Sequence, residues 1–200
     1  MHPHQAFRFE DRAVLEALVE QIGFGMVFAA TPHGPRVAHT PLFSTGDGAV
    51  QFHLSNGNAL TAHLDGETVL AVVNGPDAYV SPRWYGDREE VPTWNYVSVE
   101  LEGRVRRMDG DGLDGMLRTL VETHEERLGN GEAWSMDEVP DDKLRPMMRY
   151  ITGFEMEVQA WRPTFKLSQN HPAADRARVI EGLERAGSPA LAELMRTFAP

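Results

Sequence analysis

Two short segments of the sequence combine the polar groups that bind anions or the polar rim of a heterocycle. Residues 166–170 read KLSQN and place one cation, one hydroxyl and two amides directly before an expected helix. Residues 55–58 read SNGN, where an expected strand ends and a short helix begins. Hydroxyls, amides and the N–H groups at a helix start can coordinate a phosphate. An ordinary capped turn is the favoured interpretation of SNGN, whereas for KLSQN the turn and the ligand site are balanced.

Other familiar catalytic and metal-binding patterns do not occur in the sequence. His39, His53 and His63 lie on or after neighbouring expected strands, but their spacing fits no known ligand motif, so half-buried polar positions are the favoured interpretation. No serine lies in a GxSxG elbow, and neither a phosphate-binding P-loop nor a GxGxxG fingerprint is found. The chain has no cysteine, which excludes disulfides, thiol nucleophiles and iron–sulfur clusters.

The segment YVSPRWYGDREEVPTWNYV (79–97) concentrates large aromatic residues where the pattern indicates turns and surface. Trp and Tyr provide rigid surface with little entropy to lose, which suits a pocket for a planar ligand and also a subunit interface. A local cluster that covers one end of a barrel is the third possibility. The residues alone leave all three open.

The composition restricts the class of protein. The chain has 200 residues, 42% of them hydrophobic and 24% charged, which is an ordinary globular composition. A net charge of −11 opposes binding to nucleic acid or anionic membranes, and the best basic cluster is only Arg104, Arg106 and Arg107. The sequence shows neither a membrane-spanning run nor a secretion signal, so we expect a cytoplasmic protein.

Hydrophobic periodicity predicts a mainly β protein with α-helices, in the α+β class. We expect one domain of six or seven antiparallel strands, with helices at its edges and a helical tail. Residues 1–165 would form the barrel with inserted helices, and residues 166–200 the KLSQN segment and the C-terminal helices. Asn170 or His171 would cap a helix that has Pro172 in its first turn. The expected strands are 24–31, 36–43, 49–55, 68–74, 94–108 and 151–161; the expected helices are 10–22, 58–65, 111–128, 142–149 and two after 170.

Four segments together resemble one protein family. They are HTPL (39–42), GPDAYVSPRWY (75–85), VPTWNYVSV (91–99) and FKLSQN (165–170). They are similar to the PaiB-type FMN-binding proteins, a family usually named FMN-binding negative transcriptional regulators, and the similarity covers nearly the whole chain. The resemblance implies a split β-barrel like that of the pyridoxamine-phosphate oxidase and flavin-reductase superfamily. It also implies a homodimer that holds FMN in a cleft between its two chains.

The resemblance assigns roles to particular residues. The strand RVAHTPLF would line the flavin ring, the SNGN region would follow the ribityl chain and phosphate, and KLSQN would close the pocket from either chain. The implied cofactor-binding residues are Arg36, His39, Thr40, Pro41, Leu54, Ser55, Asn58, Ala59, Trp94, Asn95, Lys166, Ser168, Gln169 and Asn170. The sequence departs from the family at Ala59 and Leu60, where close relatives are expected to have a proline and an aromatic residue.

Three functions from different classes remain open. The first is an FMN-binding regulator; the sequence has no helix-turn-helix with a basic recognition helix, so it would act through a partner or a small ligand. The second is an FMN-dependent oxidoreductase, such as a flavin reductase with a nicotinamide donor, for which His39 and Tyr85 are candidates for proton handling. The third is a split barrel that binds haem or another planar ligand, with His63 or His171 as the axial ligand.

Overall fold

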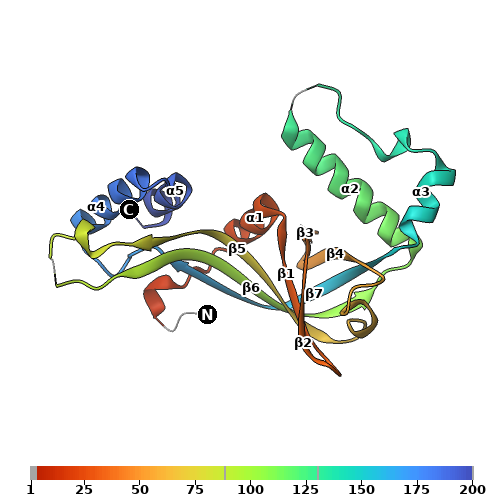
Figure 1. The fold of residues 1–200 in the computed structure, drawn as a ribbon, viewed down its shortest axis with the longest axis horizontal. Helices are drawn as coiled ribbons and strands as arrows, with labels where there is room; N and C mark the ends of the chain where they lie inside the picture. The colour runs from red at the N-terminus through yellow and green to blue at the C-terminus, as the bar shows by residue number, and fades with distance from the viewer. Residues whose placement is uncertain (1–3, 88, 130, 200) are drawn as a thin grey trace. The chain divides into compact units, whose positions relative to one another are not determined.

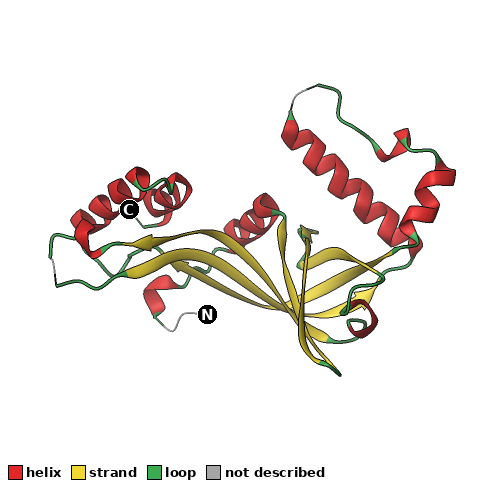
Figure 2. Cartoon of the chain, viewed as in Figure 1, coloured by secondary structure: helices red, strands yellow, loops and turns green. Residues whose placement is uncertain are grey.

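The computed structural model describes residues 4–87, 89–129 and 131–199, which form an open seven-stranded antiparallel sheet with five α-helices (Figures 1 and 2). The strand order is β2-β1-β5-β6-β7-β4-β3. The strands are β1 (Phe24–Thr31), β2 (Gly34–Pro41), β3 (Phe43–Ser44), β4 (Ala49–Ser55), β5 (Thr68–Val80), β6 (Thr93–Arg107) and β7 (Ile151–Lys166). The helices are α1 (Arg12–Ile22), α2 (Gly110–Leu128), α3 (Asp141–Met148), α4 (Ala173–Arg185) and α5 (Pro189–Phe198), with short 3₁₀ turns η1 (Gln5–Phe7), η2 (Thr61–His63), η3 (Pro82–Trp84) and η4 (Met136–Glu138). The predicted antiparallel α+β class is confirmed.

The chain divides into two compact units. We call residues 1–18, 73–100 and 162–200 the tail unit, because it contains α4 and α5, and residues 19–72 and 101–161 the hairpin unit. Strands β5, β6 and β7 contribute residues to both units. The C-terminal helices therefore share a unit with residues 73–100. The expected single domain over residues 1–200, with a barrel over 1–165, stays a prediction. No helix in the described part of the chain is long and apolar enough to cross a lipid bilayer.

The hairpin unit is built from antiparallel pairs whose alternate residues enter one core. β1 and β2 pair over their full lengths, from Phe24 opposite Pro41 to Thr31 opposite Gly34. In the β4–β7 pair, Phe52 lies opposite Phe154, and their buried rings stack at 5.4 Å between centroids. Such aromatic pairs across strands stabilise a sheet beyond the area that they bury.

The tail unit has a separate aromatic core. Phe9 stacks on Phe165 at 4.5 Å, and Phe198 of α5 contacts both rings edge-on. Helices α4 and α5 pack against each other (blue in Figure 1), and both bury apolar side chains such as Leu183 and Leu191. The first and last parts of the chain are therefore held by one aromatic cluster.

The structure corrects several expected boundaries. β5 continues to Val80 and β7 to Lys166, well beyond the predicted ends at 74 and 161. The predicted helix 58–65 is only the 3₁₀ turn η2. The residue that caps α4 is Pro172, and not Asn170 or His171. The reason is that Pro172 has extended backbone angles (φ −57°, ψ 152°), so the helix begins after it.

Candidate functional site

A polar cavity of about 300 Å³ lies in the tail unit. Residues of the segment 85–95 and of the KLSQN segment form much of its wall, together with residues near the N-terminus. The lining residues are His4, Phe7, Tyr85, Glu90, Val91, Thr93, Asn95, Lys166, Ser168, Asn170 and His171. The cavity thus brings together four of the cofactor-binding residues predicted from the sequence, namely Asn95, Lys166, Ser168 and Asn170.

The end of β7 and the turn after it position the KLSQN side chains. Ser168 has a φ of +64°, in the left-handed region that residues other than glycine rarely adopt. The Gln169 side chain holds this turn, because its amide donates to the carbonyl of Phe165 (2.5 Å) while its oxygen accepts from the N–H of Leu167 (2.8 Å). Gln169 therefore shapes the turn that presents Lys166 and Ser168, and it does not line the cavity.

Asn95 lies on the buried face of β6 and is fully buried. Its Nδ2 donates to the hydroxyl of Ser168 (2.9 Å) and lies 3.5 Å from the sulfur of Met195. Its Oδ1 is buried and has no hydrogen-bond partner among the described residues. Buried side-chain oxygens are usually paired with protein or ordered water, so this atom marks a place where the cavity can accept a hydrogen bond.

A tyrosine, a histidine and a glutamate form the other polar side of the cavity. The Tyr85 and His171 rings are 4.7 Å apart, and His171 Nδ1 lies 3.6 Å from a carboxylate oxygen of Glu90. The Tyr85 hydroxyl is buried and has no partner in hydrogen-bond geometry within the described residues. Burial raises the pKa of this hydroxyl, and the nearby Ser168 side chain acts in the opposite direction. At neutral pH, Tyr85 therefore keeps a proton that it can donate to a ligand.

Lys166 is the lysine of this cavity. Its ammonium group donates a hydrogen bond to the hydroxyl of Thr93 on β6. Burial lowers the pKa of Lys166, because removal from water disfavours the charged form. Together with Tyr85, it provides hydrogen-bond donors to the same cavity that contains the unpaired oxygen of Asn95.

The opposite face of β6 has an aromatic surface. Successive residues of a strand point to opposite faces, so Trp94 lies on the side away from Asn95, and the two predicted contacts do not share a face. Trp94 is 54% exposed and contacts Tyr79, itself 48% exposed, edge-on at 6.3 Å. A hollow of about 280 Å³ lies beside Trp94, and Gly75 is one of its lining residues. A Cβ at Gly75 would lie 3.1 Å from the Cβ of Val97.

The remaining predicted residues lie in the hairpin unit. Thr40 is buried and donates to the carbonyl of His53 (2.7 Å), which places the end of β2 beside the end of β4, near Pro41, Leu54 and Ser55. Arg36 lies four residues earlier on β2, near the β1–β2 turn, and its side chain donates to the carbonyl of Pro35. Four residues of a strand span about 13 Å, so Arg36 is separate from the Thr40 group. His39 is exposed on β2, opposite Met26.

Three N–H groups of the SNGN turn donate to protein oxygens, that of Asn56 to the carbonyl of Tyr150. Gly57 N–H donates to the Ser55 hydroxyl and Asn58 N–H to the Ser55 carbonyl, while the Asn58 side chain accepts from Leu60 N–H. These bonds agree with the capped turn as the favoured interpretation. Ala59 follows Asn58 as an exposed residue, and the assignment of this segment to the flavin phosphate stays a prediction.

Three residues with polar functions were not found from the sequence. Glu90 and Thr93 belong to the loop and strand start before Asn95, where no motif distinguished them from other polar residues. His53 was expected to be a half-buried polar position rather than a metal ligand, and no hydrogen-bonding role was assigned to it. It is partly buried, its Nδ1 has no hydrogen-bond partner in the described part of the chain, and burial lowers its pKa.

Comparison with known proteins places the chain in a family. Residues 1–160 match the family described as “Putative FMN-binding domain”. Over 202 aligned residues, the chain is 31% identical to the protease synthase and sporulation protein PAI 2 of Bacillus subtilis, which covers 98% of this chain and 96% of that protein. Among solved structures, the FAD and haem binding protein of Mycobacterium smegmatis has a TM-score of 0.61 at 17% identity, covering 84% of this chain and 78% of that one.

The flavocytochrome Anf3 of Azotobacter vinelandii is similar in fold, with a TM-score of 0.59 at 17% identity, covering 82% of this chain and 72% of that one. At this identity the likeness concerns the fold, and it confirms the predicted split-barrel architecture. The buried acceptor of Asn95 and the donors beside it are groups that a flavin ring can use. The chain belongs to the FMN-binding domain family and is a PaiB-like flavin-binding protein.

Proposed function

We propose that the protein is a homodimer that binds FMN at the interface between its two chains. The family description supports FMN as the flavin. The observation that carries the dimeric site is the exposed aromatic surface of Tyr79 and Trp94, on the face of β6 opposite the polar cavity. Large aromatic side chains are enriched in the buried centres of protein interfaces, and a second chain would remove both rings from water.

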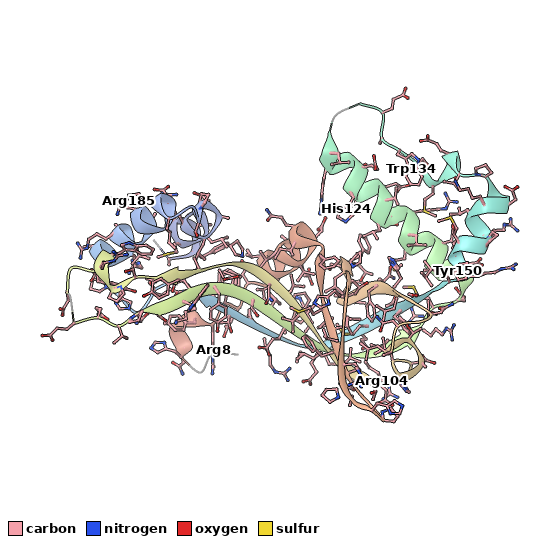
Figure 3. All side chains as sticks on the ribbon, in the orientation of Figure 1. Arg8, Arg104, His124, Trp134, Tyr150 and Arg185 are labelled. Atoms are coloured by element: carbon pink, nitrogen blue, oxygen red, sulfur yellow. The ribbon has the colours of Figure 1, made fainter. Side chains whose placement is uncertain are left out.

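Two variants that each place a charge on an exposed tryptophan test this proposal. Trp94→Glu introduces a carboxylate into the aromatic surface and should shift the protein toward monomer and weaken FMN binding by about tenfold or more. Trp134→Glu is the matched control, because Trp134 is 41% exposed and lies before η4 in the hairpin unit (Figure 3). It should leave both properties unchanged.

The measurements are the visible absorption spectrum, the quenching of FMN fluorescence during titration, and the molar mass from light scattering. A parallel titration with FAD distinguishes the two flavins, and a Soret band would indicate haem instead. A monomeric wild-type protein that binds FMN would contradict the interface, and a protein that binds no flavin would contradict the cofactor.

The family name refers to a role in regulating transcription. We propose that the protein performs this role through a partner or a small ligand and not by binding DNA directly. The name of the Bacillus subtilis relative, which refers to protease synthesis and sporulation, agrees with a regulatory role. Two of the three arginines of the basic cluster lie beside carboxylates. Arg106 makes two hydrogen bonds to Glu155, and Arg104 (labelled in Figure 3) lines a 500 Å³ cavity that also has four carboxylates, from Asp47, Asp65, Glu155 and Glu157. A promoter-fragment shift at low salt would overturn this view.

A flavin-dependent oxidoreductase with a nicotinamide donor is the second candidate. The group of Tyr85, His171 and Glu90 favours it, because a protonated phenol beside an imidazole and a carboxylate can hold and return a proton. Of the two proton-handling candidates, Tyr85 lines the cavity, whereas His39 lies in the other unit. Anaerobic mixing of the flavin-loaded protein with NADH or NADPH tests this function, and no bleaching with either donor would count against it.

A further inference from the structure

The tail-unit cavity contains a hydrogen-bond acceptor that the protein itself does not satisfy. Oδ1 of Asn95 is fully buried and unpaired among the described residues, although Nδ2 of the same side chain is held by Ser168. With Nδ2 bonded to Ser168, Oδ1 is the atom of this amide that can accept a hydrogen bond from a ligand. A buried acceptor without a partner lowers the stability of the folded protein. A ligand with an N–H or O–H group can supply the missing hydrogen bond, and the free energy of that bond then contributes to binding.

The same cavity offers donors as well as this acceptor. The buried Tyr85 hydroxyl has no hydrogen-bond partner among the described residues, and the Lys166 ammonium has hydrogens beyond the one that it gives to Thr93. A ligand group that satisfies all three residues must therefore combine one donor with the capacity to accept two hydrogen bonds.

A phosphate fits this set poorly. At neutral pH, a phosphate monoester carries about two negative charges and mainly acceptor oxygens. In this cavity it would face the buried oxygen of Asn95 and the carboxylate of Glu90. Lys166 is the only cation of fixed charge among the described lining residues, and its burial already disfavours the charged form. A neutral ligand group agrees better with these surroundings.

We propose that this cavity binds the pyrimidine edge of the flavin ring, with Asn95 Oδ1 accepting from the ring N3–H while Tyr85 and Lys166 donate to the two ring carbonyls. The edge is a neutral imide with an acceptor, a donor and an acceptor in sequence, which is the complement of the three groups. The proposal rests on the proposed flavin binding and adds which end of the cofactor the tail unit recognises. In this arrangement, Asn95 selects flavins whose ring nitrogen N3 carries a hydrogen and no other substituent.

The test compares FMN with 3-methyl-FMN, in which a methyl group replaces the N3 hydrogen and the phosphate is unchanged. Fluorescence titration of the flavin-free wild-type protein should show about tenfold or weaker binding of the methylated ligand, as expected for a buried acceptor left unpaired. This comparison uses the unmodified protein, so it does not depend on the folding of any variant. Proton exchange at N3 of bound ¹⁵N-labelled FMN, followed by NMR, should be slowed as a second readout.

Two variants locate the contact. Asn95→Leu should bind FMN more weakly than the wild type and should bind FMN and 3-methyl-FMN equally. Gln51→Leu is the control, because the Gln51 amide lies on β4 in the hairpin unit, donates to Glu155 and lines neither the cavity nor the hollow beside Trp94, so it should leave the discrimination intact. Circular dichroism and thermal melting establish that each variant is folded.

Each outcome separates this proposal from the proposed flavin binding. Equal affinity of the wild type for both ligands would overturn the pyrimidine-edge assignment and leave flavin binding intact. Discrimination that persists in a folded Asn95→Leu variant, or disappears in Gln51→Leu, would also overturn it. No binding of either ligand by the wild-type protein would overturn both.

Discussion

Gly182→Ala is expected to destabilise the tail unit, although Ala is normally a better helix residue than Gly. Gly182 lies inside α4, and the indole ring of Trp84 in η3 packs directly on it. A Cβ at this position would lie 2.3 Å from Cδ2, 2.6 Å from Cε2 and 2.7 Å from Cγ of that ring. Ordinary contacts begin at 3.4 Å, so the ring would have to move by 1.1 Å (3.4 − 2.3).

Two opposing effects determine the magnitude. Gly→Ala in a helix interior contributes about 0.5–1 kcal/mol of stability, whereas overpacking costs about 1–3 kcal/mol. Gly115→Ala in α2 is the matched control, because no atom lies within 4 Å of the position that its new methyl group would take, and it should therefore gain only the helix contribution. The two variants should differ by about 2 kcal/mol in the free energy of unfolding, or about 4–8 °C in Tm for a chain of this size.

Thermal and urea unfolding followed by circular dichroism measure this difference. The double variant Trp84→Ala/Gly182→Ala provides the second control, because the new methyl group then meets no ring and the helix contribution should return. If Gly182→Ala raises Tm as much as Gly115→Ala does, the packing of Trp84 on α4 is refuted.

Two further changes test other contacts. Gly103→Ala would place a Cβ 2.2 Å from the carbonyl oxygen of Glu157; because backbone cannot rotate away, we expect a loss of about 3 kcal/mol or more, visible as low soluble yield or a lowered Tm. The Gly86 N–H and then Arg178 lower the pKa of Asp175, so its stabilising contribution is present above the ordinary value of 3.8 and is lost as the pH falls through the lower folded-state pKa. Asp175→Asn should therefore lower Tm at neutral pH, with the difference from wild type shrinking in acid; a difference independent of pH would contradict this reasoning.

The alternation of apolar and polar residues along the chain was sufficient to predict most strands of the sheet. In β6, the predicted inward set Val97, Val99, Leu101 and Val105 is buried, because these residues repeat with period two. The same reasoning ended β5 too early, at 74, because Gly75, Pro76 and Asp77 are all unfavourable in strands. The structure continues the strand through them to Val80, since neighbouring strands supply partners that local preferences do not reveal.

The polar cavity was predicted only in part. Motif resemblance identified Asn95, Lys166, Ser168 and Asn170, which the fold brings together. It could not place Glu90, because a residue in a charged loop has no periodicity to indicate which way it points. The predicted residues are also divided between two units. Long-range contacts determine this division, and the order of residues along the sequence does not reveal such contacts.

The two segments that first indicated ligand chemistry differ in how their polar groups are satisfied. In SNGN, the N–H groups of Gly57 and Asn58 donate to Ser55, and the donors of Asn56 bond to the carbonyls of Tyr150 and Arg149. A ligand would therefore have to replace bonds that already exist. In KLSQN, the Gln169 side chain bonds to the backbone of the turn, and Lys166 and Ser168 line a cavity. In that cavity Asn95 and Tyr85 each have a polar atom without a hydrogen-bond partner in the described part of the chain. A turn whose polar groups are already hydrogen-bonded needs no ligand for its stability. The buried polar atoms of Asn95 and Tyr85, in contrast, gain hydrogen bonds when a ligand binds. The hydrogen-bonding free energy therefore supports the proposed binding of the flavin ring beside KLSQN. SNGN serves as part of the connection from β4 to β5.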